Sequence, residues 1–217
     1  MRPIISVVGK AKSGKTTLLE GLIVELKQRG YKVAVIKHAG DDFELDTLGK
    51  DSWRLSQAGS EVVAISSPHK LAVITQVERD FSPRELSRFI VWDYDLILTE
   101  GFKQGSTPKI EVHRKEQGQE LLCPPRQLLA IVTDEPLDVD VPQFSMDEVQ
   151  GLADLIENKM LALPAKGEDI DLFINDAHIP VNLFLRNLLA RTLVAMVSCL
   201  KGVKEVKSLH IWLRRKA

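Results

Sequence analysis

Apolar and polar positions follow two periods along this chain. Continuous apolar runs that are typical of buried strands occur at residues 4–9, 31–38, 61–68, 70–77, 95–101 and 127–134. Between these runs, apolar residues recur at helical spacing, as at Leu18, Leu22 and Leu26 before Gly30, and again in residues 82–90 and 145–158. Strands that alternate with helices form a mostly parallel sheet with helices on both faces. The pattern therefore predicts an α/β fold.

The periodic pattern fades at residues 162–169, a stretch with proline and glycine that is typical of a linker. We expect a main domain of residues 1–163 and a small β-β-α-β appendage of residues 164–217, with its last strand at 207–215. Residues 183–200 have an apolar face at helical spacing that Arg186 and Arg191 interrupt, which predicts a core helix and not a membrane span. Because such an appendage is small for independent stability, it is expected to pack on the main domain or on a second subunit.

The charge balance and the cysteines narrow the class of protein. The formal net charge of −1 gives no basic field that would attract nucleic acid. The two cysteines, Cys123 and Cys199, are far apart and lack metal-ligand spacing, so a reducing compartment is expected. The first apolar run is too short for a signal peptide. We therefore expect a cytoplasmic protein that binds neither nucleic acid nor membranes.

A phosphate-binding motif follows the first strand. Gly9-x-x-x-x-Gly14-Lys15-Thr16 matches the P-loop pattern in full, between a buried strand and an amphipathic helix. The glycines allow consecutive backbone N–H groups to point at phosphate oxygens, and the helix directs its positive dipole end to the same place. Lys15 supplies a positive charge to the β- and γ-phosphates, and Thr16 offers a hydroxyl to Mg²⁺. The motif predicts a P-loop NTPase fold with a site for a nucleoside phosphate.

Acidic residues at two strand ends are candidate metal neighbours, because Mg²⁺ prefers oxygen ligands. Glu100 ends the run 95–101, at the sheet edge where ligands collect in open α/β folds. Its carboxylate faces either the metal or the backbone N–H groups of the turn at Gly101. The stretch "DDFELD", residues 41–46, follows the second strand, and Asp46 is its candidate for the metal.

Four stretches of the chain together are more specific than the P-loop alone: "GKAKSGKTTLL", "VIKHAGDDFELDTLGKDSWRLSQAG", "DLILTEGFKQGSTPKIEVHR" and "AIVTDEP". They resemble the MobB-like family of GTP-binding adapters in molybdopterin guanine dinucleotide synthesis, and the similarity runs from Pro3 to Glu157. The resemblance implies GTP and Mg²⁺ as ligands and the molybdenum cofactor guanylyltransferase as partner. It also implies a homodimer and leaves open whether molybdopterin itself binds.

The resemblance assigns roles to individual residues. Phosphates and nucleotide would be held by Gly9, Lys12, Ser13, Gly14, Lys15, Thr16, Thr17, Thr133 and Asp134. Asp134 would accept hydrogen bonds from the N1–H and amino group of guanine, or else it caps a turn. Thr16, Asp46 and Glu100 would lie at the metal. Lys50, Asp51 and Ser52 would shape a loop facing the nucleotide, and Lys103, Lys109 and Arg114 would line the same edge or a partner surface.

The GTP hydrolysis expected from these residues is slow. Lys15 and Glu100 are the candidate catalytic residues, and without a water-positioning group hydrolysis would be on the order of 10⁻⁴ s⁻¹. Lys10 either reaches the phosphates of a partner subunit, as a loop lysine does in related dimeric NTPases, or is a solvated lysine. The alternative function is a P-loop kinase or ligase that uses ATP on a small metabolite. A metallochaperone NTPase ranks lower, because the chain lacks clusters of cysteine and histidine.

Overall fold

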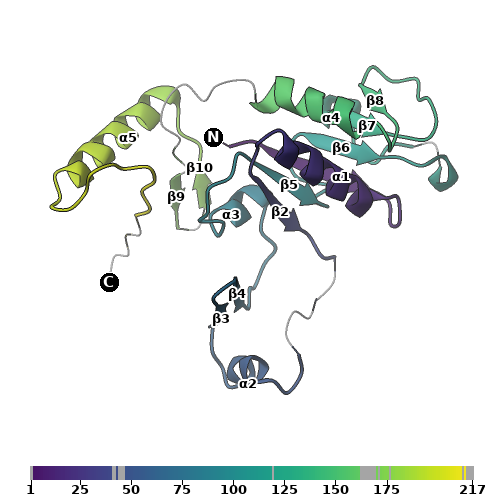
Figure 1. The fold of residues 1–217 in the computed structure, drawn as a ribbon. Coiled ribbons are helices and arrows are strands. Elements are labelled where there is room, and N and C mark those ends of the chain that lie inside the picture. The colour runs from purple at the N-terminus through teal and green to yellow at the C-terminus, as the bar shows by residue number, and fades with distance from the viewer. Residues whose placement is uncertain are drawn as a thin grey trace.

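A parallel sheet of six strands forms the centre of the protein. The computed structural model describes residues 2–40, 43, 47–118, 120–161, 170, 172–175, 177–211 and 213. The strand order is β2-β5-β1-β6-β7-β8, and every neighbouring pair is parallel (Figure 1). The strands are β1 (Ile4–Gly9), β2 (Val33–Lys37), β5 (Leu96–Glu100), β6 (Lys109–Val112), β7 (Leu128–Val132) and β8 (Gln143–Phe144). The predicted α/β class is confirmed.

Two helices cover one face of this sheet. Helix α1 (Lys15–Gln28) lies beside α4 (Val149–Ile156), which continues into a π-helical turn at Glu157–Leu161. Their buried side chains pack on alternate residues of the central strands, and this cluster includes Ile5, Val7, Leu18, Leu22, Leu98, Ile110, Val132, Leu152 and Ile156. This packing orients the first turn of α1 toward the carboxyl edge of the sheet.

The opposite face of the sheet carries a smaller apolar cluster. Ile4 and Ile97 project from the strands there, and Ile90, just after helix α3 (Pro83–Ser87), packs against them. Ser82 caps α3, since its hydroxyl accepts from the Glu85 N–H while the Glu85 carboxylate accepts from the Ser82 N–H.

Two of the predicted strands do not join the parallel sheet. β3 (Val62–Ser67) and β4 (Lys70–Thr75) pair with each other as a separate antiparallel hairpin, closed by a turn at Pro68. So short a connection permits only antiparallel pairing, because a parallel crossover needs a dozen or more residues. Helix α2 (Asp51–Gln57) contacts β3 and lies with the hairpin below the sheet in Figure 1.

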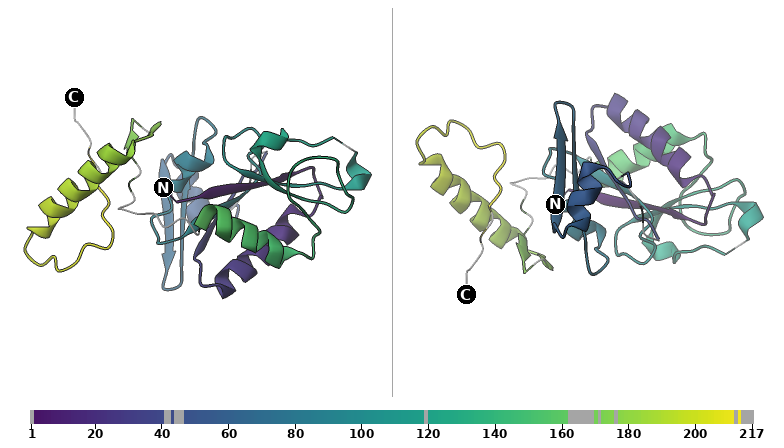
Figure 2. Two further views of the ribbon diagram at one scale, coloured as in Figure 1. Left: turned by 90° about the horizontal axis from the view of Figure 1, so that it is seen from above. Right: turned by 90° about the horizontal axis from the view of Figure 1, so that it is seen from below.

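The C-terminal appendage differs from the prediction in two ways. β9 (Leu172–Ile174), β10 (Ala177–Ile179) and α5 (Leu183–Ser198) occur in the expected order, and β10 contacts α3. α5 is not a core helix, because Ala190 is its one buried residue, and Figure 2 shows it set apart from the sheet. No strand occurs in residues 207–211 or at 213, while 212 and 214–217, like the boundary at 163/164, fall outside the described residues. None of the described helices is both long enough and apolar enough to span a bilayer.

Strand β6 was not predicted from the sequence, because charged residues alternate with its apolar ones. Lys109 and Glu111 are nevertheless buried. The Lys109 ammonium donates to the carbonyls of Gly105 and Thr107 and to the Gln127 side chain, and Glu111 accepts from the Leu122 and Cys123 N–H groups. These bonds replace the hydration that both charges lose, and they allow a polar strand inside the sheet.

Candidate functional site

The loop Lys10–Gly14 connects β1 to α1 at the carboxyl edge of the sheet. It begins at a close backbone approach, since a Cβ on Gly9 would lie 2.6 Å from the Val112 carbonyl oxygen. It ends at Gly14, whose φ of 100° lies in the left-handed region that favours glycine. Gly14 is the N-cap of α1 and no side chain caps this end, so the first amides of the helix remain available to an anion.

Inside the loop, backbone and side chains are arranged around Lys15. The Lys15 ammonium donates to the Lys10 carbonyl at 2.8 Å. Burial lowers the pKa of Lys15, and the nearby Glu100 carboxylate opposes this effect. Lys12 has a φ of 60°, which is uncommon for a residue with a side chain and typical of strained functional loops. The buried Ser13 hydroxyl has no hydrogen-bond partner among the described residues.

The predicted metal neighbours Thr16 and Glu100 do come together. The Thr16 hydroxyl donates to Glu100 Oε2 at 3.0 Å, and the Lys37 ammonium lies 3.7 Å from Glu100 Oε1. The Glu100 side chain is mostly buried, at 15% exposure. A hydroxyl and a carboxylate are the hard oxygen donors that Mg²⁺ prefers, so this pair fits the ion. Asp46 lies outside the described residues.

The described part of the chain contains no metal site built from clustered histidine, cysteine or acidic side chains. There, no group of three or more histidine, cysteine, aspartate or glutamate residues is placed to hold a metal ion. His38, at the end of β2, pairs with Asp80 at 2.8 Å and packs on the Phe102 ring.

The candidate base-reading residues follow β7, two strands from the loop. The Thr133 hydroxyl donates to the Glu135 carbonyl at 2.9 Å and accepts from the Glu135 N–H at 3.2 Å, so it closes its own turn. Asp134 Oδ1 accepts from the Lys115 N–H at 2.9 Å, and Oδ2 lies 3.5 Å from Arg114 Nη1. These two contacts lower the pKa of Asp134, the Lys115 hydrogen bond most strongly. Of the two roles expected for Asp134, the structure therefore contains the turn cap, in which its carboxylate accepts from the Lys115 N–H.

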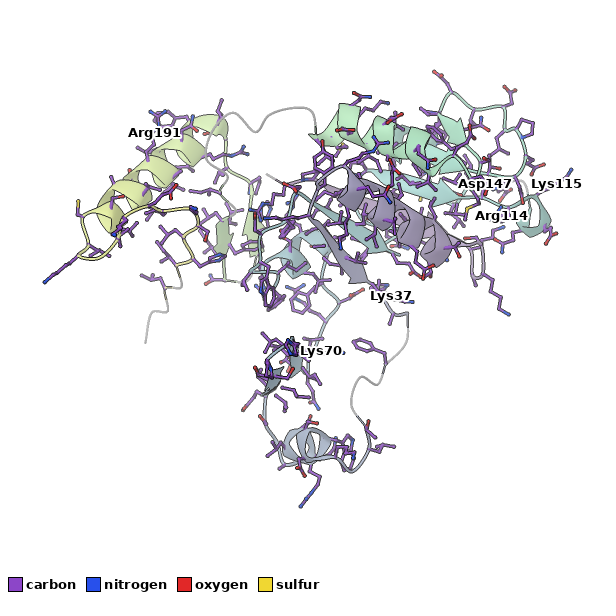
Figure 3. The ribbon with its side chains drawn as sticks, viewed as in Figure 1. Lys37, Lys70, Arg114, Lys115, Asp147 and Arg191 are labelled. Carbon is purple, nitrogen blue, oxygen red and sulfur yellow. The ribbon has the colours of Figure 1, made fainter. Side chains whose placement is uncertain are left out.

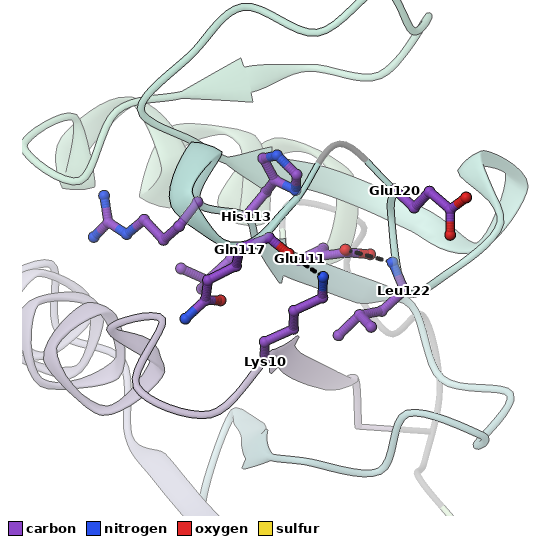
Figure 4. Close-up of a pocket in the computed structure, with 8 residues that line it drawn as sticks. Lys10, Glu111, His113, Gln117, Glu120 and Leu122 are labelled. Carbon is purple, nitrogen blue, oxygen red and sulfur yellow. Dashed lines mark hydrogen bonds between the residues drawn. The ribbon is translucent and has the colours of Figure 1, made fainter.

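The segment after β6 lies directly beside the phosphate loop. Arg114 Nε donates to the Ser13 carbonyl at 2.9 Å, and Gln117 Nε2 donates to the Ala11 carbonyl at 2.8 Å. In return, the Lys10 ammonium donates to the Gln117 carbonyl, in the pocket of Figure 4. Figure 3 labels Arg114 next to Lys115, at the right of the view. Lys10 is thus not a merely solvated lysine in this structure.

The pocket of Figure 4 opens next to Lys10, between the phosphate loop and the residues after β6. It is lined by Lys10, Glu111, Val112, His113, Arg114, Gln117, Glu120 and Leu122. Sequence reasoning missed Gln117. The β1–β6 register, which pairs Gly9 with Val112, is what brings it to the loop, and nothing local to Gln117 indicates that pairing.

Two other expectations need correction. Lys109 does not line an edge or a partner surface, because it is fully buried and donates to neighbouring acceptors. Lys50 is the N-cap of α2, and Asp51 and Ser52 are its first residues. α2 lies with the hairpin and away from the phosphate loop in Figure 1, so within one chain these residues do not face that loop. Lys103 is exposed, as expected for an edge or a partner surface.

Comparison with known proteins gives consistent matches. A family model described as molybdopterin guanine dinucleotide synthesis protein B, MobB, matches residues 4–134. The molybdopterin-guanine dinucleotide biosynthesis adapter protein of Haemophilus influenzae is 39% identical over 160 residues, which cover 72% of this chain and 88% of that protein. The Escherichia coli protein of the same name is 36% identical over 161 residues, or 72% and 92%. A crystal structure of molybdopterin-guanine biosynthesis protein B is 36% identical, with a TM-score of 0.54, and the match covers 71% of this chain and 98% of that one.

Proposed function

The chain belongs to the MobB family, and on this premise we propose that it is a GTP-binding adapter in molybdopterin guanine dinucleotide synthesis. The adapter role is the one printed in the names of the Haemophilus influenzae and Escherichia coli relatives. The observation that carries nucleotide binding is the phosphate loop, in which Lys15 and Thr16 open α1 beside the Glu100 carboxylate. Its partners are the guanylyltransferase and a second copy of the chain.

In this proposal, the phosphates of GTP lie in the loop. The amides from Lys12 to Thr17, including those of Ser13 and Gly14, donate to phosphate oxygens. The Lys15 ammonium leaves the Lys10 carbonyl and donates to the β- and γ-phosphates instead. The negative charge of the phosphates then offsets the cost of burying the ammonium group. The partnerless Ser13 hydroxyl gains an acceptor there.

Thr16 and Glu100 would hold Mg²⁺, with Asp46 as a further candidate ligand. The ion supplies positive charge that neutralises the phosphates. Lys15 and Glu100 are the proposed catalytic residues of a slow GTPase: Lys15 stabilises the charge of the transferred phosphoryl group, and Glu100 orients the groups around it.

Guanine is proposed to bind at the end of β7. A carboxylate has about four acceptor positions, so Asp134 can accept from the base while it keeps the Lys115 hydrogen bond. Thr133 holds the turn that presents Asp134, through its two bonds with Glu135. The low pKa of Asp134 keeps it ionised and accepting at neutral pH.

The hairpin β3–β4 is the proposed surface of the homodimer. Val62, Leu71 and Val73 lie on one face of the hairpin, since paired residues project to the same side, and they are 54%, 50% and 60% exposed. An isolated two-stranded hairpin is marginally stable in water, so a second copy that covers this face would stabilise it. Val73→Lys should shift the chain to a monomer in light scattering, and Val24→Lys, at an exposed valine of α1, is the matched control. A Val73→Lys protein that stays dimeric would remove the hairpin from the interface.

Nucleotide preference tests the proposed function. Calorimetric titration should show GTP binding that requires Mg²⁺, with ATP bound far more weakly. Lys15→Ala should abolish binding while the circular dichroism spectrum stays unchanged, and Lys27→Ala, an exposed lysine of the same helix, should bind like the parent. Added chain should also raise the rate of GMP attachment by the guanylyltransferase. ATP binding with GTP ignored would instead support a kinase or ligase, and retained affinity in Lys15→Ala would refute the loop assignment.

A further inference from the structure

Two carbonyl oxygens of the phosphate loop are held by side chains of one distant segment. Ala11 O accepts from Gln117 Nε2 at 2.8 Å, and Ser13 O accepts from Arg114 Nε at 2.9 Å. Both donors lie just after β6, where residues Lys115–Gln117 form a short 3-10 turn. The Lys10 ammonium returns a bond to the Gln117 carbonyl, so loop and turn are joined in both directions.

The geometry of the peptide unit gives these contacts a consequence. In a trans peptide, the carbonyl of one residue and the N–H of the next point in opposite directions. A fixed Ala11 carbonyl therefore fixes the direction of the Lys12 N–H, and a fixed Ser13 carbonyl fixes that of the Gly14 N–H. These two amides belong to the set that would face phosphate.

We propose that Arg114 and Gln117 are positioning residues of the nucleotide site, which preorganise the Lys12 and Gly14 amides before a phosphate arrives. This proposal rests on the proposed nucleotide binding. Loop amides that are already aligned do not lose conformational entropy on binding, and the gain appears as affinity. Arg114 and Gln117 act through the loop backbone and need no contact with the nucleotide.

Arg114 also connects the loop to the end of β7. Its Nη1 lies 3.5 Å from Asp134 Oδ2, and the Lys115 N–H donates to Asp134 Oδ1. A Cβ on Gly14 would lie 3.2 Å from Arg114 Nη2, so the guanidinium fills the space that this glycine leaves open. Replacing Arg114 should therefore loosen both ends of the site, whereas replacing Gln117 should loosen the loop alone.

The test compares Gln117→Met and Arg114→Met with two exposed control positions, Gln104→Met and Arg126→Met. Three quantities are measured: the Kd of Mg²⁺–GTP, the Tm without nucleotide, and the ¹H–¹⁵N resonances of the loop amides without nucleotide. One net hydrogen bond corresponds to about fivefold in affinity, and one made by a charged group to about tenfold or more. We expect these losses for Gln117→Met and Arg114→Met respectively, with broadened Lys12 and Gly14 resonances. The Tm should be unchanged in Gln117→Met and slightly lower in Arg114→Met, which also loses its contact with Asp134.

A conservative variant separates positioning from simple structural support. Arg114→Lys keeps the charge, loses the planar fork, and should recover part of the affinity that Arg114→Met loses. Parent-like affinity in both methionine variants, or a Tm of Gln117→Met that falls in step with its affinity, would overturn the proposal. A parent chain that binds no GTP would refute the proposed function, and the ligand-free resonances would still decide whether Arg114 and Gln117 order the loop.

Discussion

Replacing Gly9 by alanine would place a methyl group against the neighbouring strand. Gly9 pairs with Val112 in the parallel β1–β6 ladder, and the new Cβ would lie 2.6 Å from the Val112 carbonyl oxygen and 2.6 Å from the Ser13 hydroxyl oxygen. Ordinary contacts of a Cβ begin near 3.4 Å. The serine side chain can rotate, but the Val112 carbonyl belongs to the backbone of a central strand. The strands must therefore separate locally.

The expected cost follows from overpacking. Forcing extra atoms into a packed site costs about 1–3 kcal/mol, and a clash with strand backbone belongs at the upper end, about 3 kcal/mol. For a chain of this length, about 3 kcal/mol lowers Tm by roughly 6–12 °C. Gly30→Ala is the matched control: its φ of 92° strains an alanine, but its Cβ would meet nothing within 4 Å. Backbone strain alone costs about 1–2 kcal/mol, and Tm should fall by roughly 2–8 °C.

Thermal unfolding by circular dichroism and GTP titration of the folded proteins measure both effects. Gly9→Ala should lose more stability than Gly30→Ala. It should also bind GTP more weakly, because a displacement of Val112 would shift Arg114, two residues later in the chain, which holds the Ser13 carbonyl of the phosphate loop. Gly30→Ala should bind GTP like the parent, since Gly30 follows the far end of α1. Equal Tm values for the two variants would show that the strands accommodate the methyl group, and would refute the clash.

The remaining predictions concern the parts that hold the site in place. Arg29 joins α1 to α4 through bonds of 2.6–2.9 Å to Asp154 and Glu157, whose side chains are 62% and 35% exposed, so Arg29→Met should cost about 1–2 kcal/mol in urea unfolding. Arg191→Met, at the exposed arginine labelled in Figure 3, is the control, and its free energy of unfolding should stay within about 0.5 kcal/mol of the parent. Equal losses of stability in the two variants would show that the bonds of Arg29 do not stabilise the packing of α1 on α4. The bond from Arg79, together with hydrogen bonds from the Ser82 N–H and hydroxyl, lowers the pKa of Glu85 from 4.5 to about 2. Because the folded-state pKa is the lower one, this stabilisation is present above pH 4.5 and is lost as the pH falls toward 2. In acid titrations followed by circular dichroism, Glu85→Gln should lack this component.

The predicted parts of the fold were those whose signal is local. The apolar run at 4–9, the glycine spacing and the stripe at Leu18, Leu22 and Leu26 lie within one strand–loop–helix unit, and each is found in the structure. Thr16 and Glu100 could be brought together in prediction because both occupy the carboxyl edge of parallel strands.

The parts that could not be predicted depend on distant contacts. β6 was missed because Lys109 and Glu111 are charged, and their burial depends on acceptors and donors supplied by loops. α5 was expected to be a core helix from its apolar face, yet Leu188 and Met196 on that face are 51% and 64% exposed. Helical periodicity shows which residues share a face, but it does not show whether another element packs on that face.

The sequence by itself determined a phosphate loop between a buried strand and a helix, because that motif requires only neighbouring residues with the right backbone freedom and charge. The tertiary structure decided what surrounds it. Gln117 and Arg114 are 106 and 101 positions from the loop carbonyls that they hold. Hydrogen bonds act over about 3 Å in space, and only the pairing of β1 with β6 brings such distant residues within that range.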